Sequence, residues 1–221
     1  MTKHVVITGA NRGIGLNLCQ QYLAKGYQVT AVVRTPSDEL KELDVTVISN
    51  IDVANAADIE TLENQLHGHK IDLLINNAGI FHNESMAEMD FDTINQQIAI
   101  NAVAPIRVTH ALIHCLGIDA KVAMISSRLG SIADNDSGGY IGYRMSKAAL
   151  NVASVSLAHE LKSKKIAVGL FHPGFVQTQM VNYAGDISPE LSAELLAQRI
   201  DELNLSNSGG FWHSNGETLP W

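Results

Sequence analysis

The sequence predicts a single α/β domain in which a doubly wound parallel sheet carries helices on both faces. Short runs of β-branched and aliphatic residues alternate along the chain with stretches of helical periodicity. A glycine-rich turn joins the first of these runs directly to the first helical stretch. The 221 residues are 46% hydrophobic, enough for a sizeable core, and no linker divides them. We therefore expect one domain over residues 1–221.

The expected elements follow one another in strand–helix order. Buried parallel strands are predicted over residues 5–7, 29–33, 45–48, 73–75, 122–125 and 166–171. Helices are predicted over residues 16–23, 59–66, 94–116 and 143–161. The irregular stretches 129–140 and 177–189 each follow a strand, so both are expected to form loops over a ligand crevice at the carboxyl edge of the sheet. Residues 177–189 are the candidate short substrate loop.

Composition argues against several classes of protein. Fifteen Lys and Arg against 23 Asp and Glu give a net charge of −8, which disfavours general binding of nucleic acid or anionic membranes. Cys19 and Cys115 are too few for a disulfide framework, and His110 and His114 share a helix face without a third ligand, so no metal is expected. The apolar run 5–7 is too short for a signal peptide, and no run approaches about 18 residues. We expect a cytoplasmic protein.

The first strand–helix turn, Thr8 to Gly15, is suited to a dinucleotide phosphate. Glycines permit a tight turn and a close approach of the backbone to a pyrophosphate, while the start of the helix supplies free N–H groups. A glycine turn that binds nothing is the alternative. The candidate ligands are Gly9, Asn11, Arg12, Gly13, Ile14 and Gly15.

Two arginines favour NADP(H) over NAD(H). Sites for the unphosphorylated cofactor usually place an acid near the end of the second strand, whereas Val33-Arg34 stands there in this chain. Arg34, with Arg12 in the glycine turn, could bind a 2′-phosphate through charge-assisted hydrogen bonds. Asp38 and Glu39 follow closely enough to leave NAD(H) open, and both arginines could instead be solvated.

A tyrosine and a lysine form a candidate proton-transfer pair. Tyr143 and Lys147 are four residues apart at the start of a predicted helix, so they share one face. A tyrosine titrates near about pH 10, and an adjacent ammonium or a cationic nicotinamide would lower its pKa toward neutrality. Alone, the pair could equally be an ordinary aromatic–lysine contact.

Together these motifs resemble the short-chain dehydrogenase/reductase family, whose order they follow from residue 8 to residue 178. The chain's tail, residues 210–221, is similar to the end of the C-factor and sniffer-type carbonyl reductases. The resemblance implies a Rossmann-like fold. The matching motifs are Gly9-x-x-x-Gly13-x-Gly15, Asp52-Val53, Asn76-Asn77-Ala78-Gly79, Asn101, Ser127, Tyr143-x-x-x-Lys147 and Pro173-Gly174 with Thr178.

The resemblance also implies a role for each motif. Tyr143 would be the acid/base and Ser127 would orient the substrate carbonyl. Lys147 would lower the tyrosine pKa and hold the nicotinamide ribose, and Asn101 would complete a water-linked proton relay. The family pattern places Asp52 and Val53 at the adenine, Asn77, Ala78 and Gly79 along the adenosine ribose, and Pro173, Gly174, Val176 and Thr178 at the nicotinamide carboxamide.

Asn101 has a physical rationale as well. Pro105 has no N–H, so the carbonyl of Asn101 four residues earlier loses its helical partner and could hold a water beside Lys147. A simple proline kink is the alternative.

The serine and the tyrosine each have rivals. Ser127 stands sixteen residues before Tyr143, a longer spacing than in much of the family, and Ser126 and Ser131 are alternatives to it. Ser127 is preferred because it directly follows a strand and matches the family's Ser-Ser pair. Tyr140 is disfavoured because its residue at i+4 is Arg144, whose charge cannot be tuned as that of a lysine can.

The expected activity is NADPH-dependent reduction of an aldehyde, ketone or diketone. Oxidation of an alcohol by the same residues is one alternative, and a cofactor-binding signalling module of the C-factor type with little turnover is another. The protein is expected to bind a small molecule and to form a homodimer, or a tetramer, through helices 94–116 and 143–163. Small residues on the second helix would allow close packing, namely Ser146, Ala148, Ala149 and Ala153. Apolar residues expected near the carbonyl are Phe81, Tyr140, Phe175, Met180 and Tyr183.

Overall fold

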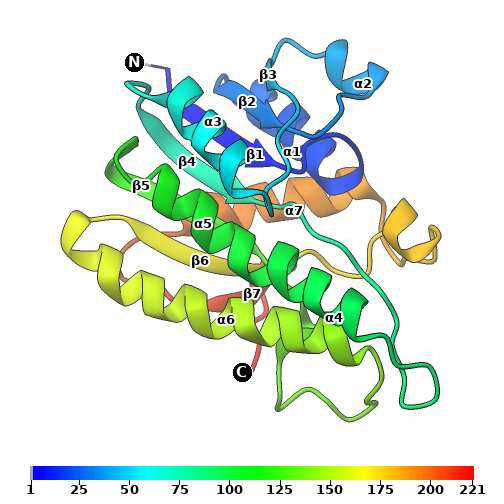
Figure 1. Ribbon diagram of the computed structural model, residues 1–221. Helices are drawn as coiled ribbons and strands as arrows, with labels where there is room; N and C mark the ends of the chain where they lie inside the picture. The colour runs from blue at the N-terminus through cyan, green and yellow to red at the C-terminus, as the bar shows by residue number, and fades with distance from the viewer. Residues whose placement is uncertain (1) are drawn as a thin grey trace.

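A computed structural model describes residues 2–221 and contains a sheet of seven strands, all parallel (Figure 1). The spatial order is β3-β2-β1-β4-β5-β6-β7, so the order reverses between β1 and β4. The crevice at that reversal is where this architecture binds ligands. The strands are β1 His4–Thr8, β2 Gln28–Val32, β3 Thr46–Ile48, β4 Ile71–Asn76, β5 Leu116–Ile125, β6 Ala167–His172 and β7 Phe211–His213.

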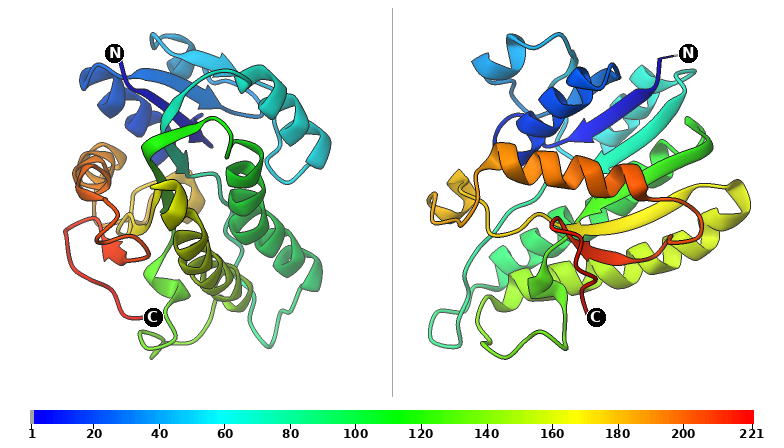
Figure 2. Two further views of the ribbon diagram at one scale, coloured as in Figure 1. Left: turned by 90° about the vertical axis from the view of Figure 1, so that its left-hand side faces the viewer. Right: turned by 180° about the vertical axis from the view of Figure 1, so that it is seen from behind.

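Helices cover both faces of the sheet, as predicted. One face carries α3, α5 and α6, with α4 packed on α6, and the other carries α1 and α7 (Figures 1 and 2). The helices are α1 Gly13–Ala24, α2 Asp38–Lys41, α3 Ala56–Leu66, α4 Phe91–Ile98, α5 Ala104–Ala111, α6 Ile141–Leu161 and α7 Pro189–Glu202.

Alternate strand residues supply two apolar cores, one on each face. Val6, Leu74 and Val122 belong to the core under α3, α5 and α6. Val5 and Ile75 belong to the core under α1 and α7. Because successive strand side chains point to opposite faces, a continuous apolar run is what a sheet covered on both sides requires. The two cores make the sheet a rigid platform for the loops at its carboxyl edge.

The single helix predicted over residues 94–116 is not found in that form. It divides into α4, a π-helical segment Ala99–Val103 and α5, and it ends at Ala111. Ala104 N–H donates to the carbonyl of Ala99, a five-residue step directly before Pro105. Because proline lacks an N–H and its ring crowds the preceding turn, the helix widens there. Leu116 belongs to β5, where it pairs with Ile71.

Helices α2 and α7 and strand β7 were not predicted. Helix α7 begins at Pro189, the last residue of the expected loop 177–189, and the Ser188 side chain accepts a hydrogen bond from Leu191 N–H. A serine cap followed by proline is a standard helix start, so the signal was present in the sequence. Strand β7 has three residues, too few for a periodic pattern to show.

Over residues 2–221, none of the helices has the length and apolar character needed to cross a bilayer.

Candidate active site

A cleft of about 710 Å³ opens at the carboxyl edge of the sheet, where the strand order reverses. Its volume is in the range of cofactor and small-molecule sites. Segments far apart in the chain meet there: the β1–α1 turn, the ends of β2 and β4, the start of α6 and the loop after β6. The predicted residues in its lining are Gly9, Asn11, Arg12, Gly13, Ile14, Gly15, Arg34, Asp52, Val53, Asn77, Ala78, Gly79, Tyr143, Lys147, Pro173 and Thr178.

The glycine turn is a closely packed backbone cradle. Gly9 has φ +66°, and a Cβ there would lie 2.7 Å from the Cα of Ala78. A Cβ on Gly15 would lie 2.3 Å from the Gly9 carbonyl oxygen. Helix α1 has neither a side-chain cap from Arg12 nor an acidic residue in its first turn. The cradle therefore presents free N–H groups to the cleft, which fits a bound pyrophosphate.

Two asparagines line the cleft, and both make hydrogen bonds to the protein segments that form it. Asn11 accepts a hydrogen bond from Ser37 N–H through its side chain and from Ser37 Oγ through its carbonyl, the latter at 2.8 Å. The Asn77 amide donates to the carbonyls of Thr8 and Gly9 at 3.1 and 3.0 Å. Both side chains thus fix the glycine turn. Asn77 still lines the cleft, so its expected place along the adenosine ribose stays a prediction.

The mouth of the cleft near β2 is positively charged. Arg12 and Arg34 are exposed, line the cleft and make no ion pair with any residue of the described range 2–221. Asp38, a rival acid for a ribose hydroxyl, instead pairs with Lys41 at 2.8 Å. The two guanidinium groups fit a phosphate at this position.

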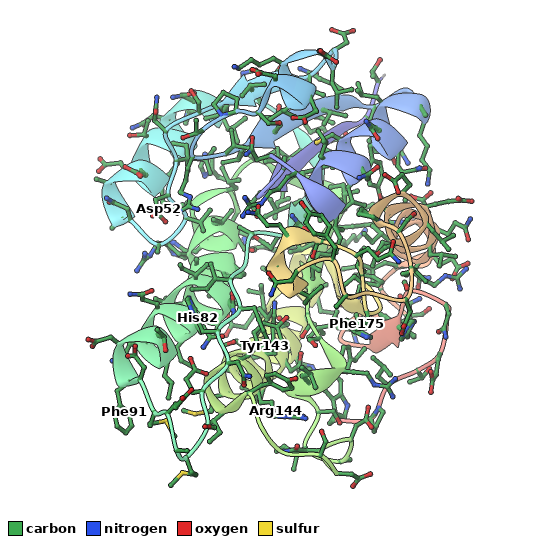
Figure 3. The ribbon with its side chains drawn as sticks, turned by 90° about the vertical axis from the view of Figure 1, so that its right-hand side faces the viewer. Asp52, His82, Phe91, Tyr143, Arg144 and Phe175 are labelled. Atoms are coloured by element: carbon green, nitrogen blue, oxygen red, sulfur yellow. The ribbon has the colours of Figure 1, made fainter. Side chains whose placement is uncertain are left out.

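Tyr143 and Lys147 lie together in the cleft on the first turns of α6. The Lys147 Nζ is 5.7 Å from the centre of the Tyr143 ring and donates to the Ile125 carbonyl at 2.9 Å. The Phe81 ring packs edge-on against Tyr143 with centroids 5.1 Å apart. Figure 3 shows Tyr143 near the middle of this view, with Asp52 above it and to the left.

Burial sets the protonation of this pair. It raises the pKa of Tyr143 to about 12, while a hydrogen bond with Ser127 acts in the lowering direction. Burial also lowers the pKa of Lys147 to about 8. The predicted lowering of the tyrosine pKa toward neutrality is not found, because removing the ring from water penalises the charged form more than its neighbours stabilise it. Tyr143 therefore carries its proton at neutral pH.

Among the three candidate serines, Ser127 is the one that acts on the Tyr143 hydroxyl, in the direction that lowers its pKa. Ser127 follows β5, is 6% exposed, and its Oγ also accepts a hydrogen bond from Leu129 N–H at 3.2 Å. Ser126 donates its hydroxyl to Asn151 Oδ1 at 2.6 Å. Ser131 Oγ accepts from Asp134 N–H at 3.1 Å. Ser126, and not Ser127, is in the lining of the cleft, so the preference for Ser127 stays a prediction.

Asn101 lies behind the cleft. Its side chain is buried, accepts from Ile80 N–H and donates to Ile80 O, each at 2.8 Å, and donates to Ser146 Oγ at 3.0 Å. A Cβ on Gly79 would lie 3.2 Å from Asn101 Oδ1 and 3.9 Å from Lys147 Nζ. Asn101 thus holds the strand-end loop beside the lysine, and the relay role of its carbonyl stays a prediction.

Two expected nicotinamide contacts lie outside the lining of the cleft. Val176 is 4% exposed and bridges to Ile187, and the Gly174 backbone packs under the Ile187 side chain. Of the expected apolar contacts, Met180 and Tyr183 line the cleft. Gln177, Gln179 and Pro189 of the expected substrate loop 177–189 also line the cleft, as does the rival serine Ser126. Lining residues that the sequence analysis did not name as site residues are Asn17, Val32, Val33, Thr35, Ile51, Ile80, Ile100, Ile125 and Glu190.

Comparison with known proteins agrees with this geometry. The family described as short chain dehydrogenase matches residues 3–187. The chain belongs to the short-chain dehydrogenase family. Within it, the chain is 35% identical to 1-hydroxy-2-glutathionyl-2-methyl-3-butene dehydrogenase of Rhodococcus sp. strain AD45, over 98% of this chain and 99% of that protein. It is 38% identical to C-signal of Myxococcus xanthus, over 68% of this chain and 93% of that protein.

Solved structures of the same family superpose closely. The NADPH-bound carbonyl reductase from chicken fatty liver gives a TM-score of 0.90 at 27% identity and covers 100% of this chain and 99% of its own. The carbonyl reductase Sniffer of D. melanogaster gives 0.91 at 28% identity and covers 100% of both chains. The predicted family, its carbonyl reductase and C-factor relatives and the fold are confirmed. Within residues 2–221, no group of three or more His, Cys, Asp or Glu is arranged to hold a metal ion.

Proposed function

We propose that this protein reduces a carbonyl group to an alcohol with NADPH. One observation carries the proposal: Tyr143, which burial keeps protonated, lies beside Lys147 in the cleft, and the Ser127 side chain, outside the lining, acts on the tyrosine hydroxyl. A protonated acid is what the reductive direction requires, since the carbonyl oxygen must gain a proton.

The cofactor assignment rests on the cradle and on the charged mouth of the cleft. The glycine turn would hold the pyrophosphate, and Arg12 and Arg34 would bind a 2′-phosphate. Asp52 and Val53 would contact the adenine, and Lys147 the nicotinamide ribose. When bound, NADPH supplies the hydride. The solved carbonyl reductase of chicken fatty liver, which is described as NADPH bound, has the same fold.

The chain's own residues would manage the proton. The Tyr143 hydroxyl would donate its proton to the carbonyl oxygen as the carbon gains the hydride, leaving an alcohol and a tyrosinate. The Ser127 hydroxyl would donate a hydrogen bond to the same oxygen and hold it in line with Tyr143. The Lys147 ammonium would stabilise the tyrosinate until a proton returns from solvent, with Asn101 as the proposed relay.

Two relatives keep alternatives open. The Rhodococcus relative is named a dehydrogenase, and the same residues run in reverse would oxidise an alcohol. The Myxococcus relative is named C-signal, which keeps a binding module with little turnover in view. The proton on Tyr143 favours reduction over alcohol oxidation.

We also propose a homodimer through α4 and α6. Apolar side chains stand exposed on these neighbouring helices: Phe91 is 71%, Met145 49% and Val152 68% exposed. Of the small residues expected at such an interface, Ser146 is fully buried and accepts from Asn101 within its own chain, so it takes no part.

The test is consumption of NADPH, with NADH in parallel, by the purified protein against a panel of aldehydes and diketones. We expect turnover with NADPH, and a loss of a hundredfold or more in kcat for Tyr143→Phe, because general acid catalysis contributes about 10²–10⁴. Tyr27→Phe makes the same chemical change away from the cleft and should retain activity.

Tight NADPH binding without turnover on any carbonyl or, in reverse, any alcohol would overturn the reductase in favour of the binding module. Turnover that survives Tyr143→Phe would remove this tyrosine from the mechanism.

A further inference from the structure

Arg144, which follows Tyr143 directly, is a buried cation with no carboxylate partner. The residue is 8% exposed, and the described part of the chain offers its guanidinium no Asp or Glu. A buried charge without an ion pair is costly unless hydrogen bonds fully satisfy it. The Arg144 guanidinium meets this requirement through hydrogen bonds to uncharged carbonyl and hydroxyl oxygens only.

All of these oxygens belong to one loop, residues 129–139. Arg144 Nε donates to the Gly139 carbonyl at 3.1 Å, and Nη2 donates to the Gly138 carbonyl at 3.1 Å and to Ser137 Oγ at 3.0 Å. Nη1 reaches the Leu129 carbonyl at 3.4 Å. One side chain thus ties both ends of the loop to the first turn of the helix that carries Tyr143.

The end of the loop that Arg144 holds is conformationally strained. Gly138, Gly139 and Tyr140 have φ values of +62°, +69° and +52° in succession. Glycine adopts this region freely, but a tyrosine there must be held by its surroundings. The backbone N–H of Arg144 donates to the Tyr140 carbonyl at 2.9 Å. Arg144 therefore makes hydrogen bonds to this turn through both its side chain and its backbone.

The strained turn is linked to the reactive tyrosine through packed aromatic rings that lie outside the lining of the cofactor cleft. The Tyr140 ring packs on Phe81 with centroids 5.4 Å apart, and Phe81 packs on Tyr143 at 5.1 Å. Figure 3 shows Tyr143 and Arg144 close together at this end of the molecule. A displacement of Tyr140 would therefore remove its ring from Phe81 and leave the Phe81 ring, which packs on Tyr143, without that support.

We propose that Arg144 is a positioning residue that shapes the substrate side of the site by holding loop 129–139 and the Tyr140 turn. The inference rests on the proposed function for its effect on catalysis. The arginine is not among the residues that line the cofactor cleft, and its side-chain hydrogen bonds all go to the loop. Its replacement should thus weaken use of bulky carbonyl substrates while leaving cofactor binding intact.

Lysine should not substitute for Arg144. An ammonium on a single stem has three donors and no planar fork, so it cannot reach Leu129 at one end of the loop and Gly138 with Gly139 at the other. Loss of one charge-assisted hydrogen bond corresponds to about a tenfold effect.

The experiment compares Arg144→Lys, Arg144→Gln and Ser137→Ala with the wild-type protein. We measure KM and kcat for benzaldehyde and for acetaldehyde, the Kd of NADPH, and the rate of chymotryptic cleavage after Tyr140. Ser137→Ala removes one of the loop oxygens that accept a hydrogen bond from Arg144. Because Ser137 is exposed, we expect this variant to fold even if Arg144→Gln does not. Arg128→Lys is the matched control, since Arg128 lies on the same segment, half-exposed and paired with Asp134.

We expect both Arg144 variants to raise KM for benzaldehyde about tenfold, acetaldehyde to be affected less, and the Kd of NADPH to stay within about twofold. Cleavage after Tyr140 should accelerate in all three variants, least in Ser137→Ala, and not in Arg128→Lys. Unchanged cleavage in the Arg144 variants would overturn the proposal, as would equal losses for both aldehydes and NADPH. Because proteolysis needs no turnover, it tests the loop even if the wild-type protein reduces no carbonyl, which would instead contradict the proposed function.

Discussion

At the scale of single residues, charge and burial divide the cleft into two regions. Near β2 the side chains of Arg12 and Arg34 are exposed. At α6 burial raises the pKa of Tyr143 and lowers that of Lys147, so that both shifts favour the neutral form of the side chain. Cofactor selection is therefore expected to depend on salt and on the loss of a charge, whereas the proton chemistry depends on burial.

The first residue-scale prediction concerns cofactor choice. Arg34→Gln should raise KM for NADPH about tenfold and leave KM for NADH unchanged, because only the 2′-phosphate loses a charge-assisted partner. Steady-state kinetics with both cofactors measure this. Lys41→Gln is the control, since Lys41 pairs with Asp38 outside the cleft lining. Equal use of the two cofactors by the wild-type protein would contradict the role of Arg34.

The rate of carbonyl reduction should depend on pH through the ionisation of Lys147. Burial sets the pKa of Lys147 to about 8 and that of Tyr143 to about 12. As the pH rises through 8, the lysine loses its charge while the tyrosine keeps its proton, so kcat/KM for reduction should fall above about pH 8. A pH–rate profile from 6 to 10 measures this fall. Lys147→Arg stays charged over this range, so its pH–rate profile should not fall above about pH 8. A fall of the same size in that variant would assign the ionisation to another group.

At the scale of elements, the side chains of two buried residues, Arg144 and Glu84, make hydrogen bonds that hold the start of α6 in place. Arg144 holds it to loop 129–139, and Glu84 holds it to α4. The Glu84 carboxylate is 2% exposed and accepts from Thr93 Oγ1 and Gln97 Nε2 at 2.7 Å and from Gly142 N–H at 3.2 Å. These contacts fix the turn that precedes Tyr143.

The element-scale prediction follows from the donors around Glu84. Glu84→Gln places an NH₂ group against either Gly142 N–H or the Thr93 and Gln97 donors, so it should destabilise the fold by about 1–3 kcal/mol. Urea unfolding measures the change. Glu88→Gln, exposed on the same loop, should be neutral. A neutral Glu84→Gln would show that the carboxylate is not needed at the helix start.

Periodicity predicted the core elements but not their ends or irregularities. Residues 71–76 and 141–161 differ from the expected strand and helix by one or two residues at their ends. The π-helical segment before Pro105 could not be derived, because a proline signals a disrupted turn without specifying how the backbone accommodates it. Helix α7 was missed although its Ser188-Pro189 start was visible.

At the scale of the whole molecule, the sheet has two apolar cores, and the neighbouring helices α4 and α6 carry three large exposed apolar side chains, Phe91, Met145 and Val152. Large exposed apolar residues on adjacent helices are typical of association surfaces. This is the physical basis for the proposed homodimer.

The whole-molecule prediction is therefore a dimer in solution. Light scattering at micromolar concentration should give twice the mass of one chain, and Val152→Asp should shift it to the monomer by burying an unpaired charge at the contact. Ile118→Asp makes the same kind of change at a residue 71% exposed at the far end of β5 and should leave the dimer intact. A wild-type monomer would refute the prediction.

The doubly wound fold, the family and most of the cleft could be predicted from the amino-acid sequence, because strand periodicity, the glycine turn and the Tyr143–Lys147 spacing are local features. The protonation of Tyr143, the hydrogen bonds by which Asn11 and Asn77 hold the glycine turn, and the contacts of Glu84 and Arg144 at the start of α6 became apparent from the folded structure alone. Those properties arise from burial and from hydrogen bonds between segments far apart in the chain. No local pattern encodes them, because desolvation and long-range contacts exist only once the chain has folded.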